Sequence, residues 1–176
     1  SSAVNELTIT NQATGSGPSL TATGGDSNID LNITAKGTGR VTLGAGKIQQ
    51  LAEKVTIAAT GTTGTVNYDL ITQAVLYHTS AAAGNFTVNV RGDSSTSLNS
   101  IMDTGESVTF AFLVTNTGTP YYQSAFQVDG SSVTPEYQGG SAPSSGNANS
   151  VDIYTYTVVK TGDAAFTAFA SQTQFA

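Results

Sequence analysis

The sequence predicts an all-β protein in two parts, a strand-and-turn stalk over residues 1–52 and an antiparallel β-sandwich head over residues 53–176. Three observations lead to this prediction. Apolar and polar residues alternate along many short stretches, which is the period-two pattern of strands with one buried side. Only 38% of the residues are hydrophobic and 10% are charged, and Gly, Ser and Thr are abundant, which is typical of short strands and turns. Good helix formers cluster at only one place, residues 47–54.

The stalk contains glycine or proline every few residues, which disfavours helix and keeps its strands short. Its central stretch spans residues 20–43. There Ile29, Leu31 and Ile33 share one parity and predict a strand with a single apolar side. After a turn at residues 36–40 the alternation resumes only briefly, so this face has too few large side chains to be buried within one chain. We therefore expect the stalk to assemble with other chains.

A weak internal repeat also favours assembly, because residues 20–24 (LTATG) resemble residues 33–37 (ITAKG). Short units closed by glycine suit copies that stack or chains that wrap around each other. The stretch SLTATGGDSNIDLNITAKGTGRVTLGAG resembles segments that recur in the fibre and appendage proteins of tailed bacteriophages. From Glu53 onward, as in GNFTVNVRGDSSTSLNSIMDTGESVTFAFLVTN, the chain resembles a domain at the end of virion structural proteins of marine cyanophages and related phages. The resemblance implies a structural role at the outer surface of a virion.

Residues 47–54 form the boundary between stalk and head, where a single helical turn and an irregular link both fit the pattern. Residues 69–78 are apolar on both parities, which predicts a strand buried on both faces or lying in a subunit contact. A helical turn is expected at residues 96–102, and a tight hairpin at Asp129-Gly130. Residues 108–114, with Phe110 and Phe112, have the largest alternating apolar face and predict a central strand. Further strands are expected near residues 55–59, 66–68, 86–91, 125–128, 133–134, 151–160 and 164–170.

About eight to ten short strands at this spacing favour an antiparallel sandwich of jelly-roll type. The chain has 12 acidic and 6 basic residues, a net charge of -6, so electrostatics do not favour nucleic acid or an anionic membrane as a partner. It has no cysteine, which excludes disulfides and thiolate metal sites. The sequence contains no run of about 18 apolar residues, so it predicts no membrane-spanning segment. The sequence begins Ser1-Ser2-Ala3, so we expect the end of a longer or processed polypeptide.

Catalytic and metal-binding patterns are weak in this sequence. His78 is the only histidine available to a Ser-His-Asp arrangement, and no G-x-S-x-G elbow accompanies it, so we interpret it as structural. Residues 26–30 (DSNID) place oxygen ligands at alternate positions but lack the glycine and the glutamate of a calcium loop. We therefore predict no catalytic residues, no bound metal and no cofactor.

The loop at residues 137–150 is the candidate contact surface, because loops held by a rigid sandwich often carry binding. Its lack of charge suits a neutral host glycan. Tyr137 would stack beneath a sugar ring, and Gln138, Asn147 and Asn149 would hydrogen-bond its hydroxyls. The alternative is that this loop packs flat on a neighbouring subunit. The other tyrosines pose the same choice between sugar stacking and packing: Tyr121, Tyr122, Tyr154 and Tyr156.

The sequence therefore predicts a non-enzymatic structural protein of a phage virion, a trimeric fibre with a β-sandwich head that is built into the particle with other virion proteins. In one version the fibre contacts the host surface, and in another it is a capsid head fibre or decoration protein without a receptor role. A carbohydrate-binding module of an adhesin would share the fold and the tyrosines.

Overall fold

Strands dominate the computed structural model, which describes residues 4–37, 39–44, 48, 49 and 51–175. The described residues are nearly all-β, with 44% of them in strands and one short α-helix. It divides into two compact units, Ser1–Lys47 and Ile48–Ala176. The expectation of an all-β chain is thereby confirmed.

The N-terminal unit contains an antiparallel hairpin of β1 (Asn5–Thr10) and β2 (Ser19–Gly24). In its register, Leu7 lies opposite Ala22 and Ile9 lies opposite Leu20, so all four side chains share one face. That face is open in this chain, since Ile9 is 72% exposed. The hairpin is amphipathic, and within the described residues of the N-terminal unit no other strand covers its apolar face.

No strand forms in residues 25–37 and 39–44, so the strand expected at Ile29–Ile33 is wrong for the single chain. A strand needs a neighbouring backbone to satisfy its N–H and C=O groups, and within these residues no such neighbour pairs with it. The expected turn is present, because Gly39 N donates to the carbonyl of Lys36 at 3.1 Å. In the boundary region, residues 48, 49 and 51–54 are irregular, while Lys47 and Gln50 lie outside the described residues.

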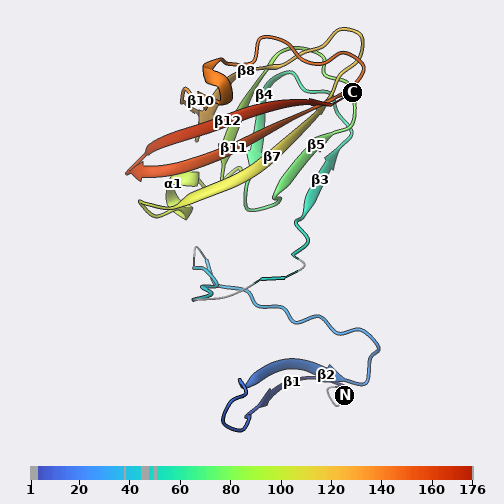
Figure 1. The fold of residues 1–176 in the computed structure, drawn as a ribbon, viewed down its shortest axis with the longest axis vertical. Coiled ribbons are helices and arrows are strands. Elements are labelled where there is room, and N and C mark those ends of the chain that lie inside the picture. Colours follow the sequence, from blue (N-terminus) through green and yellow to red (C-terminus); the bar gives the residue numbers. More distant parts are fainter. Residues whose placement is uncertain (1–3, 38, 45–47, 50, 176) are drawn as a thin grey trace. The chain divides into compact units, whose positions relative to one another are not determined.

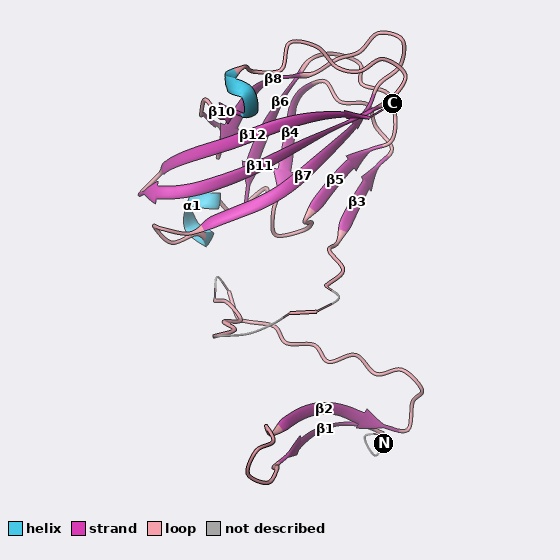
Figure 2. Ribbon diagram, viewed as in Figure 1, coloured by secondary structure: helices cyan, strands magenta, loops and turns pink. Residues whose placement is uncertain are grey.

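The C-terminal unit is a sandwich of two sheets (Figures 1 and 2). The six-stranded sheet has the order β10-β12-β11-β7-β5-β3, and the four-stranded sheet has the order β4-β6-β8-β9. The strands of the first sheet are β3 (Val55–Ala58), β5 (Val75–His78), β7 (Ser107–Thr115), β10 (Glu136–Tyr137), β11 (Val151–Gly162) and β12 (Ala165–Phe175). Those of the second are β4 (Gly64–Asp69), β6 (Phe86–Arg91), β8 (Gln123–Val128) and β9 (Ser131–Ser132).

The sheets are mixed, so the expectation of a wholly antiparallel sandwich of jelly-roll type is wrong. β3, β5 and β7 pair in parallel, as do β4, β6 and β8. From β3 to β8 the chain alternates between the two sheets, and each return to a sheet runs in the same direction. Among the strands of the described residues, antiparallel pairing is limited to β7, β11 and β12, the short hairpin β8-β9 and the hairpin β1-β2. Consecutive strands of the winding therefore lie in opposite sheets instead of forming hairpins.

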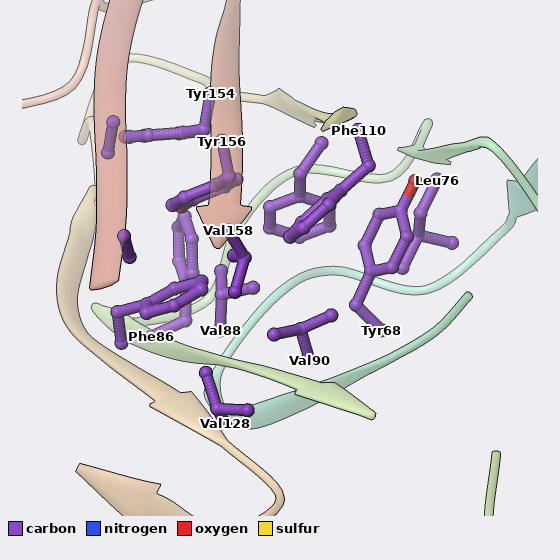
Figure 3. Packing of buried hydrophobic residues seen from close by; sticks show 14 of the residues in the cluster. Tyr68, Leu76, Phe86, Val88, Val90, Phe110, Val128, Tyr154, Tyr156 and Val158 are labelled. Carbon is purple, nitrogen blue, oxygen red and sulfur yellow. The ribbon is translucent and has the colours of Figure 1, made fainter. Parts of the chain in front are cut away.

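Aromatic side chains from both sheets fill the core between them (Figure 3). The Phe110 ring of β7 lies 4.4 Å from the ring of Tyr68 on β4, measured between centroids, and stacks 5.1 Å from Tyr156 on β11. Phe112 is fully buried and meets Phe86 of β6 edge-on at 5.6 Å. The prediction that β7 is central and buries Phe110 and Phe112 is confirmed.

A short helix, α1 (Leu98–Ile101), packs at one end of the sandwich and confirms the helical turn expected at residues 96–102. The Asp129 carboxylate accepts hydrogen bonds from the backbone N–H groups of Leu98 (2.6 Å) and Asn99 (2.9 Å) at its N-terminus. The ammonium of Lys160 donates to the carbonyls of Asn99 (2.6 Å) and Met102 (2.9 Å) at the other end. Asp129 and Gly130 both have positive φ in the β8-β9 turn, so the predicted tight hairpin is also confirmed.

The continuous strand expected at residues 69–78 is wrong, because a turn divides it. β4 ends at Asp69, and β5 begins only at Val75 in the other sheet. Between them, Thr72 N donates to the Asp69 carbonyl at 3.1 Å, which closes the turn. The apolar residues on both parities of residues 69–78 therefore belong in part to the connection that crosses from one sheet to the other and in part to the strand β5.

Candidate functional site

An open hollow of about 320 Å³ lies between residues 137–145 and β12. Two of the four candidate contact residues, Tyr137 and Gln138, line it, together with several serines and the β12 side chains Gln172 and Gln174. Among the described residues that line the hollow, none is charged. Such a surface offers amide and hydroxyl groups for hydrogen bonding to a neutral polar ligand.

The two glutamines also hold the loop in place. Gln172 Nε2 donates to the Ser145 carbonyl at 3.0 Å, and Gln174 Nε2 donates to the same carbonyl at 3.3 Å. The hollow is therefore formed by a loop that β12 restrains from one side.

Tyr137 is placed as a packing residue rather than as an open platform. Its ring is half-buried against the core, and its hydroxyl exchanges hydrogen bonds with the side-chain amide of Gln123 at 3.2 and 3.3 Å. Burial raises the pKa of Tyr137 above the usual value of a phenol. One edge of this residue still reaches the hollow, but its hydroxyl is engaged within the protein.

Asn147 and Asn149 do not line the hollow. Asn147 anchors the loop, because its backbone N–H donates to the Asp152 carboxylate at 3.0 Å and its side-chain amide donates to the Phe175 carbonyl at 2.8 Å. Asn149 is exposed, has φ near 57° and donates its backbone N–H to the Thr117 carbonyl at 3.0 Å. The structure thus brings together only the first two of the four predicted residues.

A buried polar cluster centred on Asp152 lies beneath this loop, and it was not predicted from the sequence. Asp152 is fully buried, and its Oδ2 accepts hydrogen bonds from Asn116 Nδ2 (3.1 Å), Gln172 Nε2 (3.2 Å) and the Asn147 backbone. Burial raises the pKa of Asp152, although these hydrogen bonds act in the opposite direction. Asp152 shares the parity of Tyr154 and Tyr156, so a carboxylate on the buried side of a strand was the available signal.

Gly146 permits the loop to approach this cluster. A Cβ at this position would overlap the Tyr121 carbonyl and would lie 2.7 Å from Asn116 Nδ2 and 2.9 Å from Asp152 Oδ2. Any larger residue would have to move the loop away from its anchors. The conformation of residues 141–150 is therefore set mainly by contacts with the sandwich.

Tyr154 and Tyr156 are at most 1% exposed, so for them the packing interpretation is confirmed and sugar stacking is wrong. His78 is also part of the core, where its Nδ1 lies 2.7 Å from the Thr60 carbonyl and its ring meets Phe112 edge-on. In the stalk, the Asp26 carboxylate accepts a hydrogen bond from Asn5 Nδ2 at 2.9 Å. Within the described part of the chain, no three His, Cys, Asp or Glu side chains gather as metal ligands would.

Comparison with protein-family models, with curated proteins and with solved structures yields no match for this chain. Among the described residues, no helix has the length and apolar character needed to cross a bilayer. Physical features of the molecule must therefore carry any functional conclusion.

Proposed function

We propose that this chain is a non-enzymatic structural protein of a phage virion, a fibre whose stalk joins copies of the chain and whose head is the β-sandwich. One observation carries the proposal. Eight large apolar side chains of the N-terminal unit are exposed to solvent in the single chain. Their exposed fractions run from 43% to 72% at Val4, Leu7, Ile9, Leu20, Leu31, Ile33, Val41 and Leu43.

Such a surface is costly for an isolated chain. Burying one side chain of this size stabilises a protein by about 1.5–3 kcal/mol relative to full exposure. A two-stranded hairpin such as β1-β2 is at best marginally stable alone in water. Eight open apolar positions within 40 residues therefore favour a partner that covers them, and the strand patterning at Ile29–Ile33 would gain its missing neighbour from another chain.

Copies of the same chain suit this role. In residues 1–54 four acidic residues balance four basic ones, so like charges do not oppose the association of identical segments. The resemblance of residues 19–46 to phage fibre segments also favours association of like chains, and we propose a trimer. The proposed location is the outer surface of the phage particle, in contact with other virion proteins.

The neutral hollow beside Gln138 favours a second candidate, binding of a host glycan by the head. This would make the protein a tail fibre that contacts the host, and not only a head fibre or decoration protein. A carbohydrate-binding module of an adhesin would use the same hollow, but that function does not account for the open apolar side of the N-terminal unit.

Light scattering on the full chain tests the assembly. We expect a mass of three times the 17.9 kDa chain. Replacing Leu31 and Ile33 together by serine should weaken the assembly, because both side chains are exposed in the single chain and are free to act between chains.

The matched control replaces Asn32 and Thr34, on the other parity of the same segment, by serine and alanine. This variant should keep the mass of the parent. A parent chain that stays at 17.9 kDa at every concentration would contradict the proposal.

A further inference from the structure

The outer face of five strands of the six-stranded sheet, β3, β5, β7, β11 and β12, is largely apolar and uncharged, and Glu136 on the edge strand β10 lies beside Phe169 at its border. Side chains alternate along a strand, so residues between the buried ones point away from the core. One row across this outer face consists of Ile57, Tyr77, Leu113 and Ile153, which the registers of β3, β5, β7 and β11 bring side by side. All residues of these strands and of β12 up to Phe175 are described, and none of their outward positions carries Asp, Glu, Lys or Arg.

Several side chains of this face are highly exposed to solvent. Ile57 and Val55 on the edge strand β3 are 61% and 45% exposed, and Phe169 and Phe175 on β12 are 48% and 49% exposed. The remaining outward residues of β5, β7 and β11 are aliphatic, aromatic or small hydroxyl residues. A long sheet face with so few charged side chains is typical of a surface that is covered in the assembled protein.

The other sheet of the same sandwich provides an internal comparison. On its outer face Arg91 Nε donates to the Asp69 carboxylate at 2.6 Å, and Asn89 Nδ2 donates to Asn67 Oδ1 at 2.8 Å. Gln127 lies next to Asn89 in the register. This is the polar surface expected where a sheet faces water. The difference between the two outer faces therefore belongs to the six-stranded sheet and not to the domain as a whole.

The area of this face is sufficient for a specific contact. Five strands about 4.8 Å apart, with the longer ones presenting outward residues over about 25 Å, give roughly 500 Å² of flat area. A standard protein interface takes about 800 Å² of accessible surface from each partner. The sheet face is of the same order before the relief of its side chains is counted.

The charge distribution indicates which partner fits. Beyond Lys54 the chain has eight acidic residues and only two basic ones, Arg91 and Lys160. Two such domains repel each other least where they meet through a surface with little charge, and this face, with Glu136 only on its β10 edge, is such a surface. A basic partner would instead be recognised by a cluster of acidic side chains, and among the described residues this face carries only Glu136.

We propose that the outer face of the six-stranded sheet packs against the same face of other copies of this chain. The inference rests on the assembly proposed above and adds a second contact, in the head. The chain enters this sheet at β3, and the Lys54 carbonyl accepts hydrogen bonds from Ala74 (2.9 Å) and Val75 (3.2 Å) at the start of β5. Copies joined through upstream residues are thus tethered directly to this sheet.

Single cysteines in the full chain test the contact, because the natural sequence has none. Thr155→Cys lies on β11 in the outer face of the six-stranded sheet, and Ala125→Cys lies on β8 in the outer face of the other. Both positions are exposed in the single chain, and an uncharged thiol reagent is used because Glu136 lines the same surface depression as Thr155. We expect this reagent to label Thr155→Cys at least tenfold more slowly than Ala125→Cys, and the two equally in urea.

The outcomes separate the two proposals. Equal labelling rates in a chain that scatters light as an oligomer would overturn the sheet contact and leave the assembly through the stalk standing. A parent chain of 17.9 kDa would overturn both. If Thr155→Cys does not fold, Ile57→Cys on the edge strand gives the same comparison, with slow labelling supporting the contact and fast labelling refuting it.

Discussion

Replacing Phe110 by alanine tests the packing between the two sheets. Phe110 is 3% exposed, and its ring touches both Tyr68 in the four-stranded sheet and Tyr156 in its own sheet. The change leaves a cavity at the point where the sheets meet. Such truncations cost about 3–5 kcal/mol, and each lost aromatic pair accounts for about 0.5–1.5 kcal/mol beyond the buried area.

The expected loss is large enough to measure directly. For a domain of this size, about 1 kcal/mol shifts the midpoint of thermal unfolding by roughly 3–5 °C. The Phe110→Ala variant should therefore melt about 10–20 °C below the parent in far-ultraviolet circular dichroism. Parent and variant must be compared at one chain concentration, because association also raises the melting temperature.

Thr65→Ala is the control for this experiment. Thr65 is an exposed residue on β4, and its loss should cost about 1 kcal/mol at most. A Phe110→Ala protein that melts within about 2 °C of the parent would refute the account of the core, since truncating a buried phenylalanine should lower the free energy of unfolding by much more than such a shift indicates.

Two further predictions concern the loop beside the hollow. Burial raises the pKa of Asp152 in the folded state, so the folded protein keeps that proton to higher pH than the unfolded chain. The stability contributed by the protonated form is lost as pH rises above the usual carboxyl value of about 4, so the melting temperature of Asp152→Asn should increase relative to that of the parent as pH rises above this value. A difference that does not change with pH would contradict this. If the hollow binds glycan, Gln138→Ala should reduce binding to a panel of neutral bacterial polysaccharides without lowering the melting temperature. The exposed control, Gln12→Ala, should leave binding unchanged. Equal binding by both variants would refute the glycan site.

The candidate contact residues show where loop reasoning reaches its limit. Composition alone indicated that residues 137–150 form a loop, and after the short β10 and a 3₁₀ turn at Gln138–Gly140 they do. Composition does not show which side chains face outward. The side-chain amide of Asn147 donates to the Phe175 carbonyl, which comes from a distant part of the chain, and its backbone N–H donates to the buried Asp152 carboxylate.

The alternation of apolar and polar residues predicted many features of this protein from the sequence alone. It located the buried sides of β6 and β7 and the existence of β11, because a period of two specifies which side chains must leave water whatever the neighbouring strand is. The helical turn at α1 and the Asp129-Gly130 hairpin were equally local, since each depends on a few adjacent residues. The open apolar positions of the stalk also followed from the sequence, because a chain with so few large residues there cannot cover them itself.

Only the tertiary structure decided which strands pair and in which direction. The sequences of β3 to β8 do not indicate that alternate strands lie in opposite sheets, because the pattern of inward-facing residues is the same in a hairpin and in a parallel winding. The Asp152 cluster, for which the sequence offered only an acid on the buried parity of β11, and the largely uncharged outer face of the six-stranded sheet were not predicted for the same reason. Each is assembled from residues far apart in sequence, such as Ile57 and Ile153, and they become one surface only when the long-range registers are formed.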